Sequence, residues 1–142
     1  MKPFPHDYDA QLSGSASGYA MMTVTGLPDL RTAPPVEFDG PGDAWTPEHL
    51  LLASVQTCFL FTFRAVARAS KLDFDLLSVT ARGVVDRQEG VTRFTEIVLT
   101  ATLSAGPGLD RERAIKALHK SERNCLVTAS LSTPVRLEIT FG

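Results

Sequence analysis

The stretch TPEHLLLASVQTCFLFTFRAVARA, residues 46–69, constrains how the rest of this 142-residue chain folds. Thr46 suits the N-cap of a helix, Pro47 suits the first helical position, and Glu48 places a negative charge in the first turn. The pattern predicts one long helix from Pro47 to the end of the stretch. Its charge-free part, residues 50–63, is shorter than the roughly 20 apolar residues of a membrane span, which indicates a core helix. Apolar residues lie on nearly every side, so we expect a second subunit to supply part of its cover.

Two strands and a long loop are predicted before this helix. Residues 7–13 and 18–26 read as strands joined by a Gly/Ser turn, which makes a hairpin. Residues 26–47 are rich in proline and glycine and predict a long loop. Because the loop carries Phe38 and Trp45, and disordered segments tend to lack aromatic residues, we expect it to pack over another part of the protein.

The second half of the chain predicts three more strands and one more helix. Residues 76–90 and 91–105 alternate with a period of two and indicate a long hairpin. Asp110 suits the N-cap of a helix over residues 111–125, and residues 135–141 alternate as a final strand. The order ββ-α-ββ-α-β, with a buried helix among antiparallel strands, predicts a domain of the α+β class.

Composition and charge exclude several classes of partner. A net charge of -2 gives no electrostatic reason to expect nucleic acid, and no run of like charge indicates a membrane surface. The N-terminus lacks an apolar stretch of signal-peptide length, so we expect a cytoplasmic protein. His6, His49 and His119 share no metal-ligand spacing with the cysteines, and we therefore expect no bound metal.

Cys58 and Cys125 are the only cysteines, and both are predicted to lie on buried helix faces. In a reducing cytosol such a pair is more typical of redox chemistry than of a structural disulfide, although a buried free cysteine is most often a small hydrophobic residue. Helical geometry places Cys58 in an apolar row, where burial raises the pKa of a thiol and leaves it unreactive without help. Cys125 should face inward beside Leu118 on the second helix. Whether the two sulfurs meet stays open at this point.

The run PEHLLLASVQTCF, residues 47–59, followed by ERNCLVTASL, residues 122–131, resembles the OsmC/Ohr family. The family takes its name from osmotically inducible protein C and the organic hydroperoxide resistance protein. The likeness extends from about Gly26 to the end of the chain. It implies that residues 1–142 form a single OsmC-like domain, in which a central helix is wrapped by antiparallel sheets in an intertwined homodimer with two active sites at its interface.

The resemblance also implies an activity: thiol-dependent reduction of organic hydroperoxides to alcohols in the oxidative stress response. It assigns Cys58 as the peroxidatic thiol and Cys125 as the resolving thiol, which condenses with a Cys58 sulfenic acid to form a disulfide. An external dithiol, lipoyl-type or other, then reduces the disulfide, and no metal, haem or flavin is bound. A catalytic Glu48 would have to come from the partner subunit, since it lies about 15 Å along the helix axis from Cys58 of its own chain.

Further expectations concern the groups around the thiol. In the best-studied branch of the family, an arginine on the N-terminal hairpin holds the peroxidatic thiolate. Here the hairpin has no arginine, and the first arginine of the chain is Arg31 in the long loop. Arg31 is either the cation that activates Cys58 or a solvated loop charge. The candidates for a substrate pocket, which are equally candidates for the core, are Phe38, Trp45, Phe59 and Phe61. If no cation reaches Cys58, the alternative function is a non-catalytic dimer that binds a small molecule or senses redox state. A third possibility is a structural dimer whose cysteines have no function.

Overall fold

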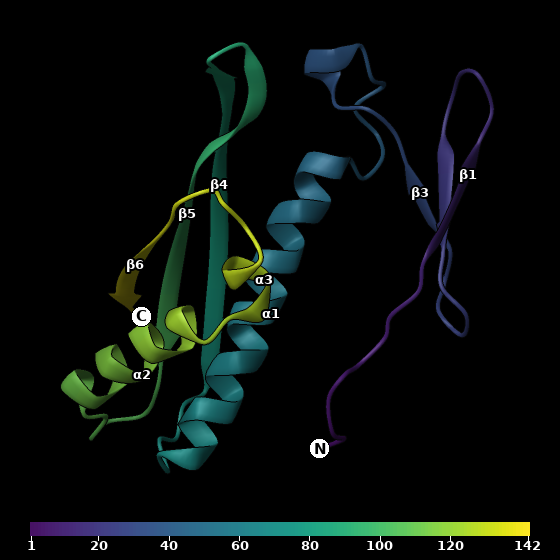
Figure 1. The fold of residues 1–142 in the computed structure, drawn as a ribbon. Coiled ribbons are helices and arrows are strands. Elements are labelled where there is room, and N and C mark those ends of the chain that lie inside the picture. Colours follow the sequence, from purple (N-terminus) through teal and green to yellow (C-terminus); the bar gives the residue numbers. More distant parts are fainter. The chain divides into compact units, whose positions relative to one another are not determined.

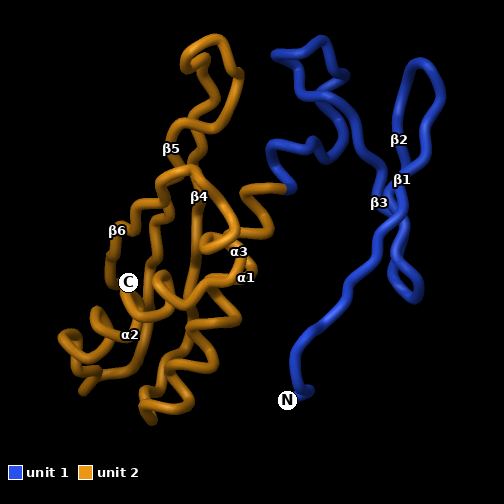
Figure 2. Tube along the Cα trace, viewed as in Figure 1, with its two compact units in different colours: residues 1–50 blue, residues 51–142 orange.

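The computed structural model describes residues 1–142, which divide into two compact units (Figure 2). The first unit is Met1–Leu50 and the second is Leu51–Gly142. The boundary falls within the first turn of the long helix. The expectation of a single domain over the whole chain stays a prediction.

The first unit contains a three-stranded antiparallel sheet (Figure 1). Its strands are β1 (Gln11–Gly14), β2 (Ala20–Thr23) and β3 (Leu30–Thr32), in that order across the sheet. The predicted hairpin is confirmed as β1 and β2, although both strands are shorter than the sequence suggested. The third strand lies inside the segment predicted as a loop, so that interpretation was wrong for residues 30–32.

The remainder of that segment is ordered by backbone contacts. A short 3-10 helix, η1 (Val36–Phe38), is followed by a turn, and the Ala33 amide donates to the Trp45 carbonyl at 2.9 Å. Gly40 is required here, because a Cβ atom at this position would collide with the Pro34 carbonyl oxygen.

The long helix α1 (Pro47–Ala69) has the predicted bounds. Its cap is confirmed, since the backbone N–H of His49 donates to the Thr46 hydroxyl at 3.0 Å. The residues of its buried face are Val55, Phe59, Phe63, Val66 and Ala67. The opposite side is left partly uncovered, and Phe61 is 57% exposed. By length and composition α1 could also cross a membrane, a test that the core helix of a soluble protein passes too. The absence of a membrane partner therefore stays a prediction.

The sheet of the second unit is built on the long hairpin predicted from the sequence. The hairpin consists of β4 (Leu76–Gln88) and β5 (Val91–Ser104), and β5 also pairs with β6 (Val135–Phe141). The pairing of β5 with β6 is parallel, so the expectation of antiparallel strands was wrong for this pair. A parallel neighbour needs a crossover, which the helices between β5 and β6 provide.

Helix α1 packs on one face of this sheet. The buried residues of β5 on that face alternate along the strand and are Ile97, Leu99, Ala101 and Leu103. Opposite Ile97 in the register is Gly83, where an added Cβ would lie 2.5 Å from the Phe94 ring and 3.1 Å from Leu52 of α1. A side chain at this point would therefore displace the Phe94 ring and crowd Leu52.

The second helix is shorter than predicted. Helix α2 (Arg111–Arg123) is capped by Asp110, whose side chain accepts from the Arg113 amide at 3.2 Å, as expected. It ends before Cys125, so the placement of Cys125 within this helix was wrong. Asn124 terminates α2, and Cys125 is the N-cap of a separate short helix, α3 (Leu126–Ala129).

Candidate active site

The two cysteines meet in the second unit. Cys58 projects from the middle of α1 and Cys125 from the start of α3, and each thiol shifts the pKa of the other. Both are free thiols. Cys125 is almost fully buried, with 1% of its surface exposed, whereas Cys58 is only partly buried. A small molecule that enters from solvent therefore has better access to the Cys58 sulfur.

The surroundings of Cys58 favour its thiolate. Burial is the largest influence and raises the pKa of Cys58. Four hydrogen bonds together outweigh the effect of burial, so the pKa of Cys58 lies below the ordinary value for cysteine. In decreasing order of effect they come from the Val127 amide, the Cys125 thiol, the Thr62 hydroxyl and the Leu126 amide. The Thr62 oxygen is 3.9 Å from the Cys58 sulfur. The sequence-based expectation was that burial raises the pKa of Cys58 and that the thiol needs help to ionise. The burial effect agrees with it, and most of the help comes from residues at the start of α3 that the sequence did not reveal.

Cys125 has the opposite tendency. Burial raises its pKa, hydrogen bonds from Thr128 lower it, and the neighbouring Cys58 raises it again, so that the net pKa lies above the ordinary value. The Thr128 hydroxyl donates to the Cys125 sulfur at 3.3 Å. The pair therefore contains one thiol that ionises readily and one that retains its proton, which is the division of roles that a nucleophile and its hydrogen-bond donor require.

Arg31 lies on β3 of the first unit, not on a loop. Its guanidinium donates to the Asp43 carbonyl at 2.9 Å, lies 3.8 Å from an Asp43 carboxylate oxygen and stacks 4.3 Å from the centre of the Tyr19 ring. The Tyr19 hydroxyl donates to both carboxylate oxygens of Asp43, and this hydrogen bond raises the pKa of Tyr19. Arg31 is therefore a strand residue held by Tyr19 and Asp43. The sequence left two possibilities, a solvated loop charge or the cation that activates Cys58. Within the first unit Arg31 is not a free loop charge, and its action on Cys58 stays a prediction.

Glu48 occupies the first turn of α1, as predicted. One of its carboxylate oxygens, Oε1, is buried and has no hydrogen-bond partner within the chain. Leaving a buried acceptor unpaired costs about 1–3 kcal/mol. Such an oxygen points to a donor that the single chain does not supply.

The four aromatic candidates have different environments. Phe59 is fully buried in the core between α1 and the sheet. Of the two roles considered from the sequence, substrate pocket or core, it therefore has the core role. Phe38, Trp45 and Phe61 are about half exposed, at 56%, 48% and 57%. The Arg64 guanidinium lies over the Phe61 ring, 5.1 Å from its centre.

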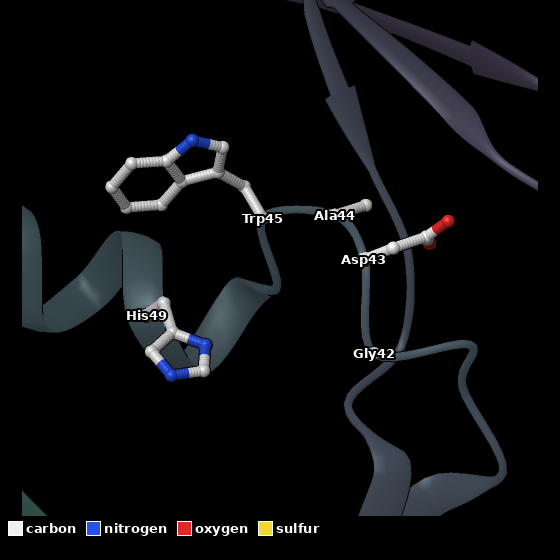
Figure 3. Close-up of a pocket in the computed structure, with 5 residues that line it drawn as sticks. All are labelled: Gly42, Asp43, Ala44, Trp45 and His49. Atoms are coloured by element: carbon white, nitrogen blue, oxygen red, sulfur yellow. The ribbon is translucent and has the colours of Figure 1, made fainter.

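Trp45 also lines an open pocket of the first unit, with a volume of about 400 Å³ (Figure 3). The other residues of its wall are Gly42, Asp43, Ala44 and His49. In Figure 3 the indole of Trp45 and the imidazole of His49 project from the same side of the chain, whereas the Asp43 side chain points the other way. The pocket thus combines one large apolar surface with one ring capable of hydrogen bonding.

Four residues of the site were not identified from the sequence: Thr62, Leu126, Val127 and Thr128. Thr62 and Thr128 follow a cysteine by four and three residues, spacings at which a hydroxyl reaches back along a helix. That spacing was the available signal. Leu126 and Val127 act through their backbone amides, which no side-chain pattern marks.

The α+β fold and the neighbouring pair of free cysteines describe a small α+β protein with a two-thiol site. Comparison with known proteins identifies its family. The OsmC-like protein family matches residues 40–140. The chain belongs to this family, and the predicted OsmC-like fold is confirmed.

Three similar proteins illustrate the family. The uncharacterized protein YmaD of Bacillus subtilis (strain 168) is 26% identical over 108 residues, which are 74% of this chain and 72% of YmaD. An OsmC-like protein of unknown function from Vibrio cholerae has a TM-score of 0.85 and 18% identity, with 95% of this chain and 99% of that chain covered. An organic hydroperoxide resistance protein OsmC from Legionella pneumophila has a TM-score of 0.77 and 24% identity, with 99% of each chain covered.

Proposed function

We propose that this protein reduces organic hydroperoxides to alcohols, with Cys58 as the peroxidatic thiol and Cys125 as the resolving thiol. The observation that carries the proposal is a partly exposed free thiol, Cys58, beside a second, buried free thiol, Cys125, in surroundings that lower the pKa of Cys58. Related structures that bear the name organic hydroperoxide resistance protein support the same substrate class. The activity is that of an antioxidant enzyme in the cytoplasm.

The chemistry needs only the two thiols and the peroxide. The Cys58 thiolate attacks the outer oxygen of the hydroperoxide, the O–O bond breaks, and the departing alkoxide takes up a proton to become the alcohol. Cys58 is left as a sulfenic acid. Cys125 then condenses with it to form a disulfide and water, and an external dithiol, lipoyl-type or other, returns both thiols. No metal, haem or flavin takes part.

A homodimer accounts for the groups that one chain leaves unpaired. The partly exposed apolar side of α1 would pack against the partner, and the buried Oε1 of Glu48 would meet a donor from the partner's site. Arg31 is the candidate cation of the same interface, where its charge would add to the amides that already favour the Cys58 thiolate. Its contact with Asp43 sets its orientation within the first unit.

The substrate would be an apolar hydroperoxide. Phe38 and Trp45 present exposed aromatic surface that suits an alkyl or aryl tail, whereas Phe61 lies on the side of α1 that would face the partner. Phe59 stays in the core and has no direct role in this proposal. A binding or sensing dimer without turnover is the second candidate, and the observation that favours it is the pairing of Arg31 with Asp43, which partly neutralises the only cation proposed for the thiol.

The test is mass spectrometry of the reduced protein before and after one equivalent of cumene hydroperoxide, timed against hydrogen peroxide, with peptide mapping of any new linkage. We expect a Cys58–Cys125 disulfide that forms faster with the organic peroxide. Thiols that react no faster than free cysteine would reject the peroxidase and leave the binding or sensing dimer.

A further inference from the structure

Thr128 is placed to act on the second of the two thiols. It is the third residue of α3, and its hydroxyl donates to the Cys125 sulfur at 3.3 Å. Cys125 is 1% exposed, so water does not supply this hydrogen bond. The other side chain that acts on the Cys125 thiol is Cys58, which raises its pKa.

A buried sulfur needs such a donor when it becomes charged. Burial disfavours a thiolate, and a hydrogen bond donated to the sulfur favours it. At Cys125, burial and the neighbouring Cys58 both raise the pKa, whereas the Thr128 side chain lowers it. Thr128 is therefore the side chain that opposes the two effects holding Cys125 in its unreactive form.

We propose that Thr128 is a positioning residue for the resolving step, whose hydroxyl orients the Cys125 sulfur and stabilises its negative charge during attack on oxidised Cys58. The inference rests on the proposed function of the cysteine pair. It adds a residue that acts through Cys125 and does not touch the peroxide.

The step balances without a further reactant. The Cys125 sulfur attacks the sulfur of the Cys58 sulfenic acid, an S–S bond forms and the S–O bond breaks. Cys125 is oxidised and the sulfenic sulfur is reduced. The proton of Cys125 joins the departing hydroxide to give water. The Thr128 hydroxyl keeps its proton throughout and donates to Cys125 until the new bond forms.

The experiment compares Thr128→Val, which removes the hydroxyl at nearly constant shape, with Thr128→Ser, which keeps it. One equivalent of cumene hydroperoxide is added to each full-length reduced protein, and sulfenic acid and disulfide are followed by rapid quenching and mass spectrometry. In Thr128→Val we expect sulfenic acid to form at the unsubstituted rate and disulfide to form about tenfold more slowly, the effect of one hydrogen bond to a charged group. Sulfinic acid should accumulate, and the pH midpoint of disulfide formation should rise. Thr128→Ser should restore the rate of disulfide formation and its pH midpoint.

A matched control is Ser130→Ala. Ser130 is the C-cap of the same helix, and its hydroxyl donates to the Leu126 carbonyl at 2.8 Å and not to either sulfur. This variant should leave disulfide formation unchanged. The inference is overturned if Thr128→Val forms the disulfide at the unsubstituted rate, or if it slows both steps equally, which would indicate a displaced helix.

A second oxidant separates this inference from the proposed function. Diamide adds to the Cys58 thiolate, and Cys125 then displaces the reduced hydrazine to form the same disulfide, without a peroxide. Slower closure in Thr128→Val but not in Thr128→Ser would support the role of Thr128 even in a protein that ignores hydroperoxides. Equal closure in all variants would overturn it.

Discussion

At the level of single residues, the two cysteines differ in how readily they lose a proton. Cys58 receives hydrogen bonds from α1 and α3 that lower its pKa, whereas Cys125 has a raised pKa, retains its proton and is more deeply buried. The same residue type therefore has two different acidities because of its neighbours. This asymmetry leads to predictions for each sulfur.

Substitution of each cysteine should separate the two steps. Cys58→Ser should abolish consumption of organic hydroperoxide, because no other thiol is accessible, while far-UV circular dichroism stays unchanged. Cys125→Ser should allow one oxidation of Cys58, and the sulfenic acid should persist or proceed to sulfinic acid. Peroxide consumption is measured with a colorimetric hydroperoxide assay, and the oxidised species by mass spectrometry. Activity that survives in Cys58→Ser would show that the nucleophile is assigned wrongly.

The pH dependence of the first step follows from the direction of the Cys58 shift. Because its pKa lies below the ordinary value, the thiolate is already formed at a pH where a free cysteine is still protonated. The rate of sulfenic acid formation should therefore fall as the pH drops through this lowered pKa and level off above it. Stopped-flow rates over a pH series, compared with those of free cysteine, give the two midpoints. A midpoint at or above that of free cysteine would contradict the prediction.

At the level of secondary-structure elements, the start of α3 is as important for the thiol as α1 itself. Leu126→Pro tests this directly, because it removes one amide donor to Cys58 while proline suits the first position of a helix. Cys125 has an extended backbone, with φ -71° and ψ 114°, which is compatible with a following proline. We expect the pKa of Cys58 to rise and its oxidation at neutral pH to slow about 2- to 10-fold, the range for one hydrogen bond.

The matched control for this variant is Leu126→Ala, which keeps the amide and loses an exposed side chain. The pKa of Cys58 can be followed by the pH dependence of its alkylation, with peptide mapping. Equal pKa values of Cys58 in the two variants would remove the Leu126 amide from the site.

The contact between α1 and the sheet depends on Gly83. Gly83→Ala should destabilise the protein by about 1–3 kcal/mol, because the new Cβ would overlap the Phe94 ring and crowd Leu52. Gly106→Ala is the control, since a Cβ there meets open space. Urea unfolding of both variants gives the free energies of unfolding. If the free energy of unfolding falls by the same amount in both variants, the cause is the replacement of a glycine and not the packing around Gly83.

Much of the architecture was predictable because it depends on local patterns. The bounds of α1 follow from Thr46, Pro47 and the apolar run, and the long hairpin follows from strict alternation in β4 and β5. The strand β3 was missed because its three residues lie among prolines. The parallel direction of β6 was missed because alternation reveals a strand but not its direction.

The candidate site was predictable only in part. The sequence places Cys58 on α1 and suggests an inward Cys125, but the contact between them depends on the break at Asn124 and the new helix after it. Three of the four groups that lower the pKa of Cys58 belong to Cys125, Leu126 and Val127, far away in the sequence. Their contribution becomes visible only once the fold brings α3 to α1.

At the level of the whole molecule, the uncovered side of α1 predicts self-association. Phe61→Asp should weaken a homodimer at least tenfold, because the loss of one buried Phe costs about 1.5–3 kcal/mol and the change occurs twice in a symmetric interface. Phe61→Leu, which stays apolar, should remain dimeric. Sedimentation velocity over a dilution series gives the dissociation constants. A monomer in the unsubstituted protein would reject the dimer.

The effect of Cys58 on the pKa of Cys125 also implies an order of events for the proposed reaction. While Cys58 is a thiolate, its charge keeps the proton on Cys125, so the resting pair is protected against premature closure. Oxidation of Cys58 to a neutral sulfenic acid removes that charge, and Cys125 then loses its proton more easily. In the proposed reaction the first step would therefore trigger the second, and no separate signal would be needed to tell Cys125 when to react.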